Sequence, residues 1–217
     1  TEWPATTGVP VTFNAGVATL NNLIYEDAGR IRLHTNVVVG MTTLAGSSNP
    51  FVVRPDVIDL EVQNAYSPQV VGRAGDDLEV VLTARSRSGQ VTPNFGQEST
   101  PETLELAEIG NAVIPVNGVD GLVDVIDDFD WIGPGEFSSQ QVRYSEVGTA
   151  EFTARAASMD YLGTGPLFTR HNVGRFVPWS FWFESGSAAA ACVASAPGFT
   201  YLDQPFYITA SASARNR

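Results

Sequence analysis

Residues 78–85 read Leu-Glu-Val-Val-Leu-Thr-Ala-Arg, with an apolar residue at every second position from Leu78 to Ala84. Glu79 and Thr83 stand between them, on the opposite side of an extended chain. A period of two residues is typical of a β-strand that buries one face and shows the other to solvent. This stretch therefore predicts a half-buried strand.

The same alternation recurs in four other stretches: residues 31–37, 58–62, 150–156 and 206–212. Turn-forming pairs such as Ser88-Gly89 and Asn117-Gly118 separate such stretches. No stretch combines apolar residues at helical spacing with caps at both ends, and the nearest, residues 101–109, is short and acidic and fits a strand equally well. Short strands between frequent turns predict an all-β protein made of antiparallel sandwiches.

The composition excludes several classes of function. The 217 residues include 24 acidic and 12 basic residues, the latter all Arg, for a net charge of −12. A protein that binds a phosphate backbone needs clustered positive charge, so we expect no nucleic-acid partner. With 43% hydrophobic and 17% charged residues, the chain has the profile of an extracellular β protein. No run of apolar residues is long enough for a transmembrane helix, and none is expected.

An internal repeat organises the chain. Residues 25–29 (YEDAG) match residues 144–148 (YSEVG), and residues 82–85 (LTAR) match residues 208–211 (ITAS), each pair roughly 120 residues apart. Residues 176–183 (FVPWSFWF) similarly resemble the stretch that begins at Phe51 (FVVRPDVIDL). The start of the chain thus matches the end of the central unit, and the end of the chain matches its beginning.

This register predicts three domains. Residues 1–54 form the C-terminal part of a first β-sandwich, residues 55–174 a complete sandwich, and residues 175–217 the N-terminal part of a third. A partial sandwich exposes strand edges and one face of its core. Because the chain begins at Thr1 without Met or signal peptide, we expect it to be processed or part of a longer chain. Neighbouring subunits could also complete the parts, or the two end segments could fold together.

Several strings occur in an order that resembles one family: residues 25–29 (YEDAG), 51–55 (FVVRP), 82–85 (LTAR), 91–96 (VTPNFG), 160–163 (DYLG), 174–178 (GRFVP) and 199–206 (FTYLDQPF). The family is the immunoglobulin-like repeat region of MshQ, the biogenesis protein encoded with mannose-sensitive haemagglutinin (MSHA) type IV pili. The resemblance implies tandem Ig-like sandwiches in a large, secreted or surface-attached bacterial protein linked to pili and adhesion. Its partners would be other domains of the same polypeptide, neighbouring subunits, or pilus and cell-surface components. The family supplies no catalytic residues to transfer.

An acidic stretch is the best candidate for a metal site. It contains Asp124, Asp127, Asp128 and Asp130, and Glu136 follows a Gly-Pro-Gly turn. Calcium takes six to eight oxygen ligands, which clustered carboxylates in a loop can supply. The spacing does not match an EF-hand loop, so a solvated acidic loop is the default interpretation and no cofactor other than calcium is expected.

Aromatic residues gather near the end of the chain and could stack on sugar rings. Trp179, Phe181 and Phe183 alternate along one face of an expected strand, so we interpret them as core residues. Trp182 points to the other face, and together with Trp131 it is the candidate for ligand binding through an exposed surface.

The remaining chemistry-bearing residues do not indicate an enzyme. His34 is expected on a strand surface and His171 in a loop, and no Ser-His-Asp arrangement, nucleophile elbow or phosphate-binding loop is present. The single cysteine, Cys192, excludes an internal disulfide; it is either buried or paired with a residue beyond Arg217.

The sequence therefore favours a non-enzymatic extracellular structural and adhesive module at the bacterial surface, associated with type IV pili. Two alternatives remain at this point. One is a filament subunit completed by strand exchange with its neighbours. The other is a carbohydrate-binding adhesin domain that uses loops or exposed aromatic residues.

Overall fold

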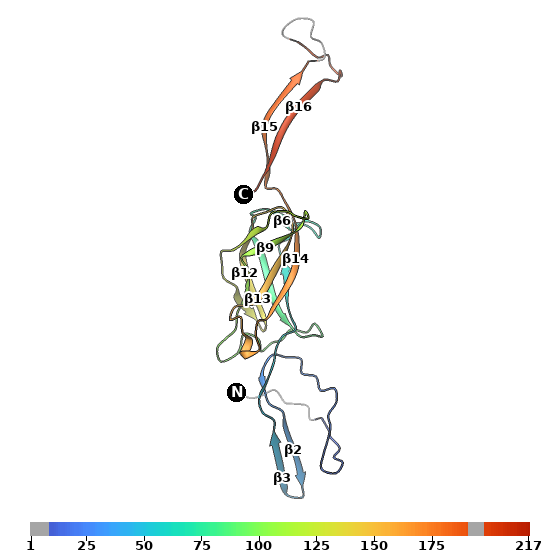
Figure 1. Cartoon of the computed structure of the whole chain (residues 1–217), viewed down its shortest axis with the longest axis vertical. Helices are drawn as coiled ribbons and strands as arrows, with labels where there is room; N and C mark the ends of the chain where they lie inside the picture. Colours follow the sequence, from blue (N-terminus) through green and yellow to red (C-terminus); the bar gives the residue numbers. More distant parts are fainter. Residues whose placement is uncertain (1–8, 191–197) are drawn as a thin grey trace.

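The computed structural model describes residues 9–190 and 198–217, and nearly all of its regular structure is β-strand. The one helical element in these residues is a short 3₁₀ turn, η1 (Tyr161–Gly163). Figure 1 shows a central body of strands with one arm at each of its two ends. The expected all-β class is confirmed.

Ten strands make up the central body of the molecule. They are β5 (Val57–Val62), β6 (Gly72–Arg73), β7 (Leu78–Arg85), β8 (Leu104–Leu106), β9 (Ile109–Ile114), β10 (Gly121–Val125), β11 (Asp130–Gly133), β12 (Glu136–Tyr144), β13 (Gly148–Ala156) and β14 (Phe168–Val177).

These strands form one sheet that folds over into two layers. Its order is β5-β7-β12-β10-β9-β13-β14-β6, with β11 added to β12 and β8 added to β13. All pairs are antiparallel except β14 with β6, which is parallel. The two layers meet where Ile58 of β5 donates its N–H to Thr169 Oγ1 at 2.9 Å and its carbonyl oxygen lies 2.7 Å from His171 Nε2. The result is a β-sandwich.

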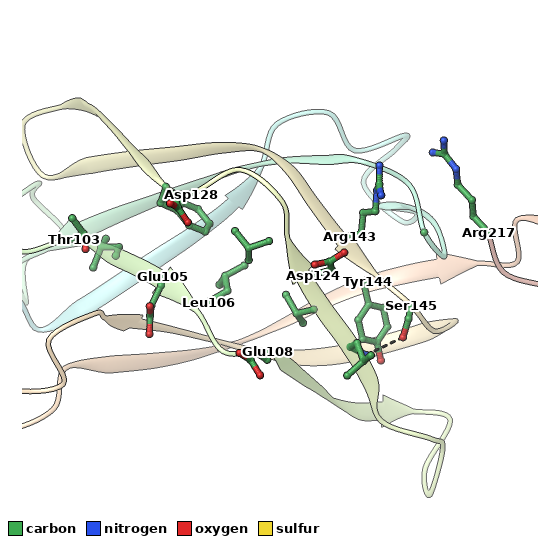
Figure 2. Close-up of a pocket in the computed structure, with 16 residues that line it drawn as sticks. Thr103, Glu105, Leu106, Glu108, Asp124, Asp128, Arg143, Tyr144, Ser145 and Arg217 are labelled. Atoms are coloured by element: carbon green, nitrogen blue, oxygen red, sulfur yellow. Dashed lines mark hydrogen bonds between the residues drawn. The ribbon is translucent and has the colours of Figure 1, made fainter.

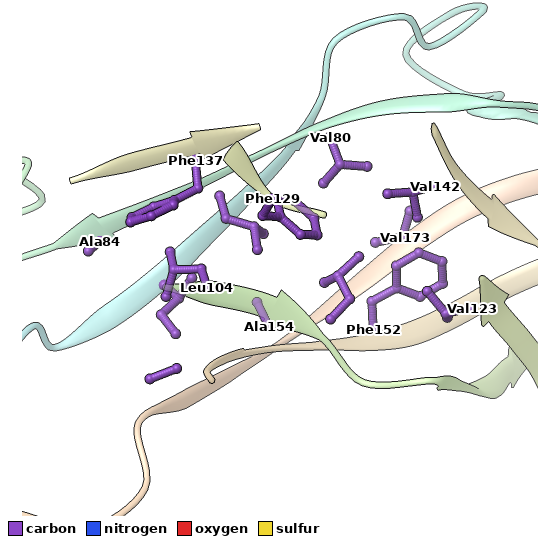
Figure 3. Packing of buried hydrophobic residues seen from close by; sticks show 14 of the residues in the cluster. Val80, Ala84, Leu104, Val123, Phe129, Phe137, Val142, Phe152, Ala154 and Val173 are labelled. Carbon is purple, nitrogen blue, oxygen red and sulfur yellow. The ribbon is translucent and has the colours of Figure 1, made fainter. Parts of the chain in front are cut away.

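The core lies between these layers and follows the alternation in the sequence. Leu78, Val80, Leu82 and Ala84 of β7 are at most 1% exposed, and Ala150, Phe152, Ala154 and Ala156 of β13 face them equally buried. Figure 3 shows Val80, Phe137 and Val142 from one layer close to Phe152, Ala154 and Val173 from the other. Each buried aliphatic or aromatic side chain contributes about 1.5–3 kcal/mol by leaving water.

Aromatic rings close the core at the end where β14 leaves the sandwich. Tyr144 lies with its ring centroid 5.4 Å from Phe152 and 4.9 Å from Phe176. Phe176, the second-last residue of β14, is 2% exposed, so this strand contributes to the core almost to its end. The domain boundary predicted at residue 174 falls inside this strand.

Two local expectations about strands were wrong. His171 lies in β14 rather than in a loop, because its stretch pairs residue by residue with β13. Residues 31–37 do not form one continuous strand: β1 (Gly29–Ile31) ends before Arg32, and β2 (His34–Val39) begins after Leu33. Of residues 101–109, the centre forms the short strand β8, which settles the ambiguity in favour of a strand.

The arms are two-stranded ribbons. In the N-terminal arm β1 pairs with β4 (Phe51–Val53) and β2 pairs with β3 (Thr42–Ser47); in the C-terminal arm β15 (Ser180–Ala189) pairs with β16 (Tyr207–Arg215). Figure 1 places them at opposite ends of the sandwich. The two end segments therefore do not build a composite sandwich within the described parts of one chain.

Candidate functional site

The C-terminal arm exposes a row of large apolar side chains. Along β15, Phe181 is 73%, Trp182 58% and Phe183 63% exposed, and on β16 Tyr207 and Ile208 are also exposed. Phe181 and Phe183 point to one face of the ribbon and Trp182 to the other. The expectation that Phe181 and Phe183 fill a core is wrong for this chain, because no second layer formed by residues 9–190 or 198–217 covers the ribbon.

The N-terminal arm has the same character. Every residue of β2 and β3 is exposed, including Val37, Val38 and Val39 and, across the ribbon, Leu44. His34 also lies on this surface, as expected. A two-stranded ribbon is marginally stable in water by itself, and contiguous apolar patches of this kind mark interaction sites. Both arms are therefore candidate interfaces.

Hydrogen bonds fix the N-terminal arm to the sandwich. Asp27 Oδ1 accepts from the backbone N–H of Asn94 at 3.0 Å, and Glu26 Oε1 accepts from Ser88 Oγ at the same distance. Ala28, which follows Asp27, is 1% exposed and belongs to the core cluster. Arg54 Nη1 adds a bond to the carbonyl oxygen of Pro166 at 3.2 Å. This junction is a built contact rather than a free linker.

A stack of cations and one indole ring fixes the C-terminal arm. Trp179 is half-buried, with the guanidinium carbon of Arg73 3.8 Å and that of Arg217 5.1 Å from its ring centroid. Asn216 Nδ2 donates to the carbonyl oxygen of Ser145 at 2.6 Å, and the N–H of Arg217 donates to that of Ala74. The sequence pattern predicted Trp179 as a core residue and missed this role, which depends on arginines distant in sequence.

Asp76 holds Arg73 in place for this stack. Its Oδ2 accepts from Tyr66 Oη at 2.7 Å and from the backbone N–H of Arg73 at 2.8 Å, and the Arg73 guanidinium lies 3.3 Å away. Burial by itself raises the pKa of Asp76, but these donors and the Arg73 charge outweigh it and lower the pKa from its ordinary value. The carboxylate is therefore charged wherever the sandwich is folded at neutral pH.

A groove of about 1020 Å³ runs along the open edge of the sandwich (Figure 2). Glu105, Glu108, Asp124 and Asp128 line it together with Arg143. Two of its charges are in ion pairs: Arg143 Nε lies 2.6 Å from Asp77 Oδ1, and Arg155 Nε lies 2.7 Å from Glu105 Oε1. The groove has the charges of a solvated sheet edge, and among its residues we find no nucleophile paired with a base.

The acidic stretch does not form a metal site in this structure. Asp124 and Asp128 line the groove, whereas Asp127 contributes its backbone oxygen to Ser139 Oγ and Asp130 begins β11. Across residues 9–190 and 198–217, no three His, Cys, Asp or Glu side chains are placed to hold a metal ion. Calcium binding stays a prediction without a formed set of ligands.

The two candidate tryptophans lie far apart in the fold. Trp131 is 53% exposed on β11 of the sandwich, and Trp182 lies on the C-terminal arm with the Arg215 guanidinium 5.3 Å from its ring centroid. The structure does not bring them into one surface. Cys192 lies outside the described residues.

Comparison with known proteins yields one match. The family model described as DUF6701, third domain, matches residues 146–217. These residues are thus similar to that uncharacterised domain, and they take in β13, β14, the junction at Trp179 and the C-terminal arm. No curated protein and no solved structure matches the chain. No helix in the described part of the chain is long and apolar enough to cross a membrane.

Proposed function

We propose that this chain is a non-enzymatic structural and adhesive module of a bacterial surface protein, of the kind that the MshQ resemblance implies for type IV pili. In this proposal β-sandwiches follow one another end to end, outside the cell. The observation that carries it is the pair of apolar arms: each is exposed on both faces, and they extend from opposite ends of a complete sandwich.

The strand order supports immunoglobulin-like units. One layer has the order β5-β7-β12-β10 and the other has β9-β13-β14. Numbered along the unit, this is the ABED and CFG arrangement of immunoglobulin constant-type sandwiches. The short strand β6 adds to the last strand of the unit, β14, in parallel.

The arms supply strands that a sandwich of this type needs. The internal repeat relates residues 208–211 of β16 to residues 82–85 of β7, so the ribbon β15–β16 corresponds to the pair β5–β7. It likewise relates Gly29 at the start of β1 to Gly148 at the start of β13. The N-terminal arm thus corresponds to the closing strands of a preceding unit, and the C-terminal arm to the opening strands of a following one.

The groove supports a role without catalysis. Its Arg143 and Glu105 are engaged in ion pairs with Asp77 and Arg155, and these pairs join strands to one another. Exposed aromatic residues such as Trp131 are where an adhesive contact with a sugar or a protein would form.

The proposal is tested by the intact mass and terminal sequences of the protein isolated from its source, together with surface labelling of whole cells. A labelled product well above 23.2 kDa, with further sandwich sequence on both sides, is the expected result. A product of 23.2 kDa would contradict it, because the arms would then have to be completed by neighbouring chains through strand exchange.

A further inference from the structure

Both ends of the central sandwich contact the neighbouring arm through corresponding parts. At the first junction residues 25–28 of the arm contact residues 88–94, which lie in the loop after β7. At the second junction residues 144–147, the counterpart of residues 25–28 in the internal repeat, lie beside Asn216 and Arg217. Asn216 and Arg217 follow β16, the counterpart of β7.

We propose that this pairing is a recognition surface between successive sandwich units of this chain. The corner before β1 or its counterpart β13 binds the loop that follows the second strand of the next unit, which is β7 at the first junction and β16 at the second. This inference rests on the proposed end-to-end arrangement, and it adds how the units are held to one another. The partner of each surface is a sandwich of the same kind.

The polar bonds at the two corners are alike in kind. At both junctions the loop donates and the corner accepts, with the backbone and side-chain roles exchanged: the N–H of Asn94 donates to Asp27 Oδ1, and Asn216 Nδ2 donates to the carbonyl of Ser145. A glycine follows each corner at positive φ, Gly29 at 131° and Gly148 at 106°. At Gly148 a Cβ would lie 1.9 Å from the carbonyl oxygen of Ile114, so the backbone here admits no side chain. At Gly29 nothing lies within 4 Å of an added Cβ, so the two corners share the positive φ but not the close backbone contact.

Side-chain hydrogen bonds and ring packing hold in place the loop after β7, which contacts the arm at the first junction. Glu102 is 8% exposed; one of its carboxylate oxygens accepts from the backbone N–H of Ser158 and the other from Ser158 Oγ. Glu98 accepts from Tyr161 Oη at 2.8 Å, and the Tyr161 ring stacks on Phe95. Burial and this bond raise the pKa of Tyr161, so its phenol stays protonated as a donor. The loop thus presents the N–H of Asn94 at a fixed place.

At the second junction a glycine marks how closely the units approach. Gly75 has φ +89°, and a Cβ there would lie 2.7 Å from Arg217 Cβ. Arg217 also lies 3.9 Å from Asp77 through Nη1 and stacks on Trp179. Gly89 has nearly the same φ, +85°, with nothing within 4 Å of the added atom. Both Gly75→Ala and Gly89→Ala put an alanine at a left-handed φ, but only Gly75→Ala also pushes against Arg217. Comparing the two variants therefore separates the effect of the lost contact from the effect of backbone strain.

The test measures distances between spin labels in the full chain, with Cys192→Ser to remove the native thiol. One pair of labels, at Glu61 and Ser187, reports on the second junction, and a second pair, at Glu61 and Thr43, reports on the first. All three positions are exposed. We expect one narrow distance for each pair. Gly75→Ala and Asn216→Ala should each broaden the Glu61–Ser187 distance, and Gly89→Ala should leave it narrow.

Asp27→Ala should broaden the Glu61–Thr43 distance alone, and Asn36→Ala, an exposed change on β2, should broaden neither. Thermal unfolding of each variant verifies that the sandwich is intact. If Gly75→Ala does not fold, Asn216→Ala still tests the second junction, because it removes only one exposed side-chain hydrogen bond. Broad distances in the unaltered chain, or narrow ones in Asp27→Ala and Asn216→Ala, would overturn the inference. A product of 23.2 kDa from the source with narrow distances would instead sink the proposed function and leave these contacts standing.

Discussion

At the scale of single residues, Leu82 decides whether the two layers can pack. It is fully buried between them on β7. Leu82→Asp would place an unpaired carboxylate in the core and should cost at least about 4 kcal/mol, enough to abolish cooperative unfolding of the central sandwich. Circular dichroism melting of the full chain measures this. Val81→Asp, one position along and only half-buried, is the control; an unchanged melt for Leu82→Asp would mean that the strand register is wrong.

Asp76 should make the stability depend on acid. Its folded pKa lies below the ordinary value of 3.8, so its contribution is complete above that pH and is lost as the pH falls through the lower folded value. We therefore expect the melting temperature to drop more steeply below about pH 4 in the unaltered chain than in Asp76→Asn, which lacks this carboxylate. Parallel melting curves for the two proteins across that range would contradict the assignment.

At the scale of elements, the alternating pattern predicted strands better than it predicted what covers them. Residues 78–85 and 150–156 are strands with one buried face, as expected, because β7 and β13 face each other across the core. Residues 206–212 alternate just as well, yet β16 is exposed on both sides. The alternating pattern indicates which face of a strand can be buried, but it does not indicate whether another layer covers that face.

For the candidate sites too, the sequence pattern did not show what surrounds each residue. Trp182 and Trp131 are exposed, as a ligand-binding role needs, but Trp182 does not lie opposite a buried face, because Phe181 and Phe183 are exposed as well. The contacts of Trp179 with Arg73 and Arg217 could not be predicted, since these cation–π contacts join three segments far apart in sequence and have no local period. Likewise four aspartates close in sequence diverge in space, because the chain turns into β11 between them.

The C-terminal ribbon should behave as an element separate from the core. Replacing Phe181 and Phe183 by Thr removes exposed apolar surface and keeps residues that favour strands. We expect the double variant to bind less of the dye ANS at native pH while the sandwich melts at the same temperature. A fall in melting temperature with unchanged dye binding would show that the core depends on these rings.

At the scale of the whole molecule, the chain enters the sandwich at one end and leaves it at the other (Figure 1). Its corners and loops contact the arms at both ends, and each arm shows apolar faces where further layers would pack. The molecule is thus organised along one axis, with the same parts meeting at each step. This arrangement extends the molecule along its axis.

The parallel pair β6–β14 gives this axis a mechanical consequence. Val71 and Ala74 donate their backbone N–H groups to the carbonyls of Arg175 and Val177, so the early part of the unit is tied to its last strand. When the chain is pulled from its two ends, these bonds lie across the line of tension and are sheared together instead of being unzipped one after another. A load carried along the molecule would be resisted by the shearing of these bonds, together with the pairing of β5 to β7 where the chain enters the sandwich.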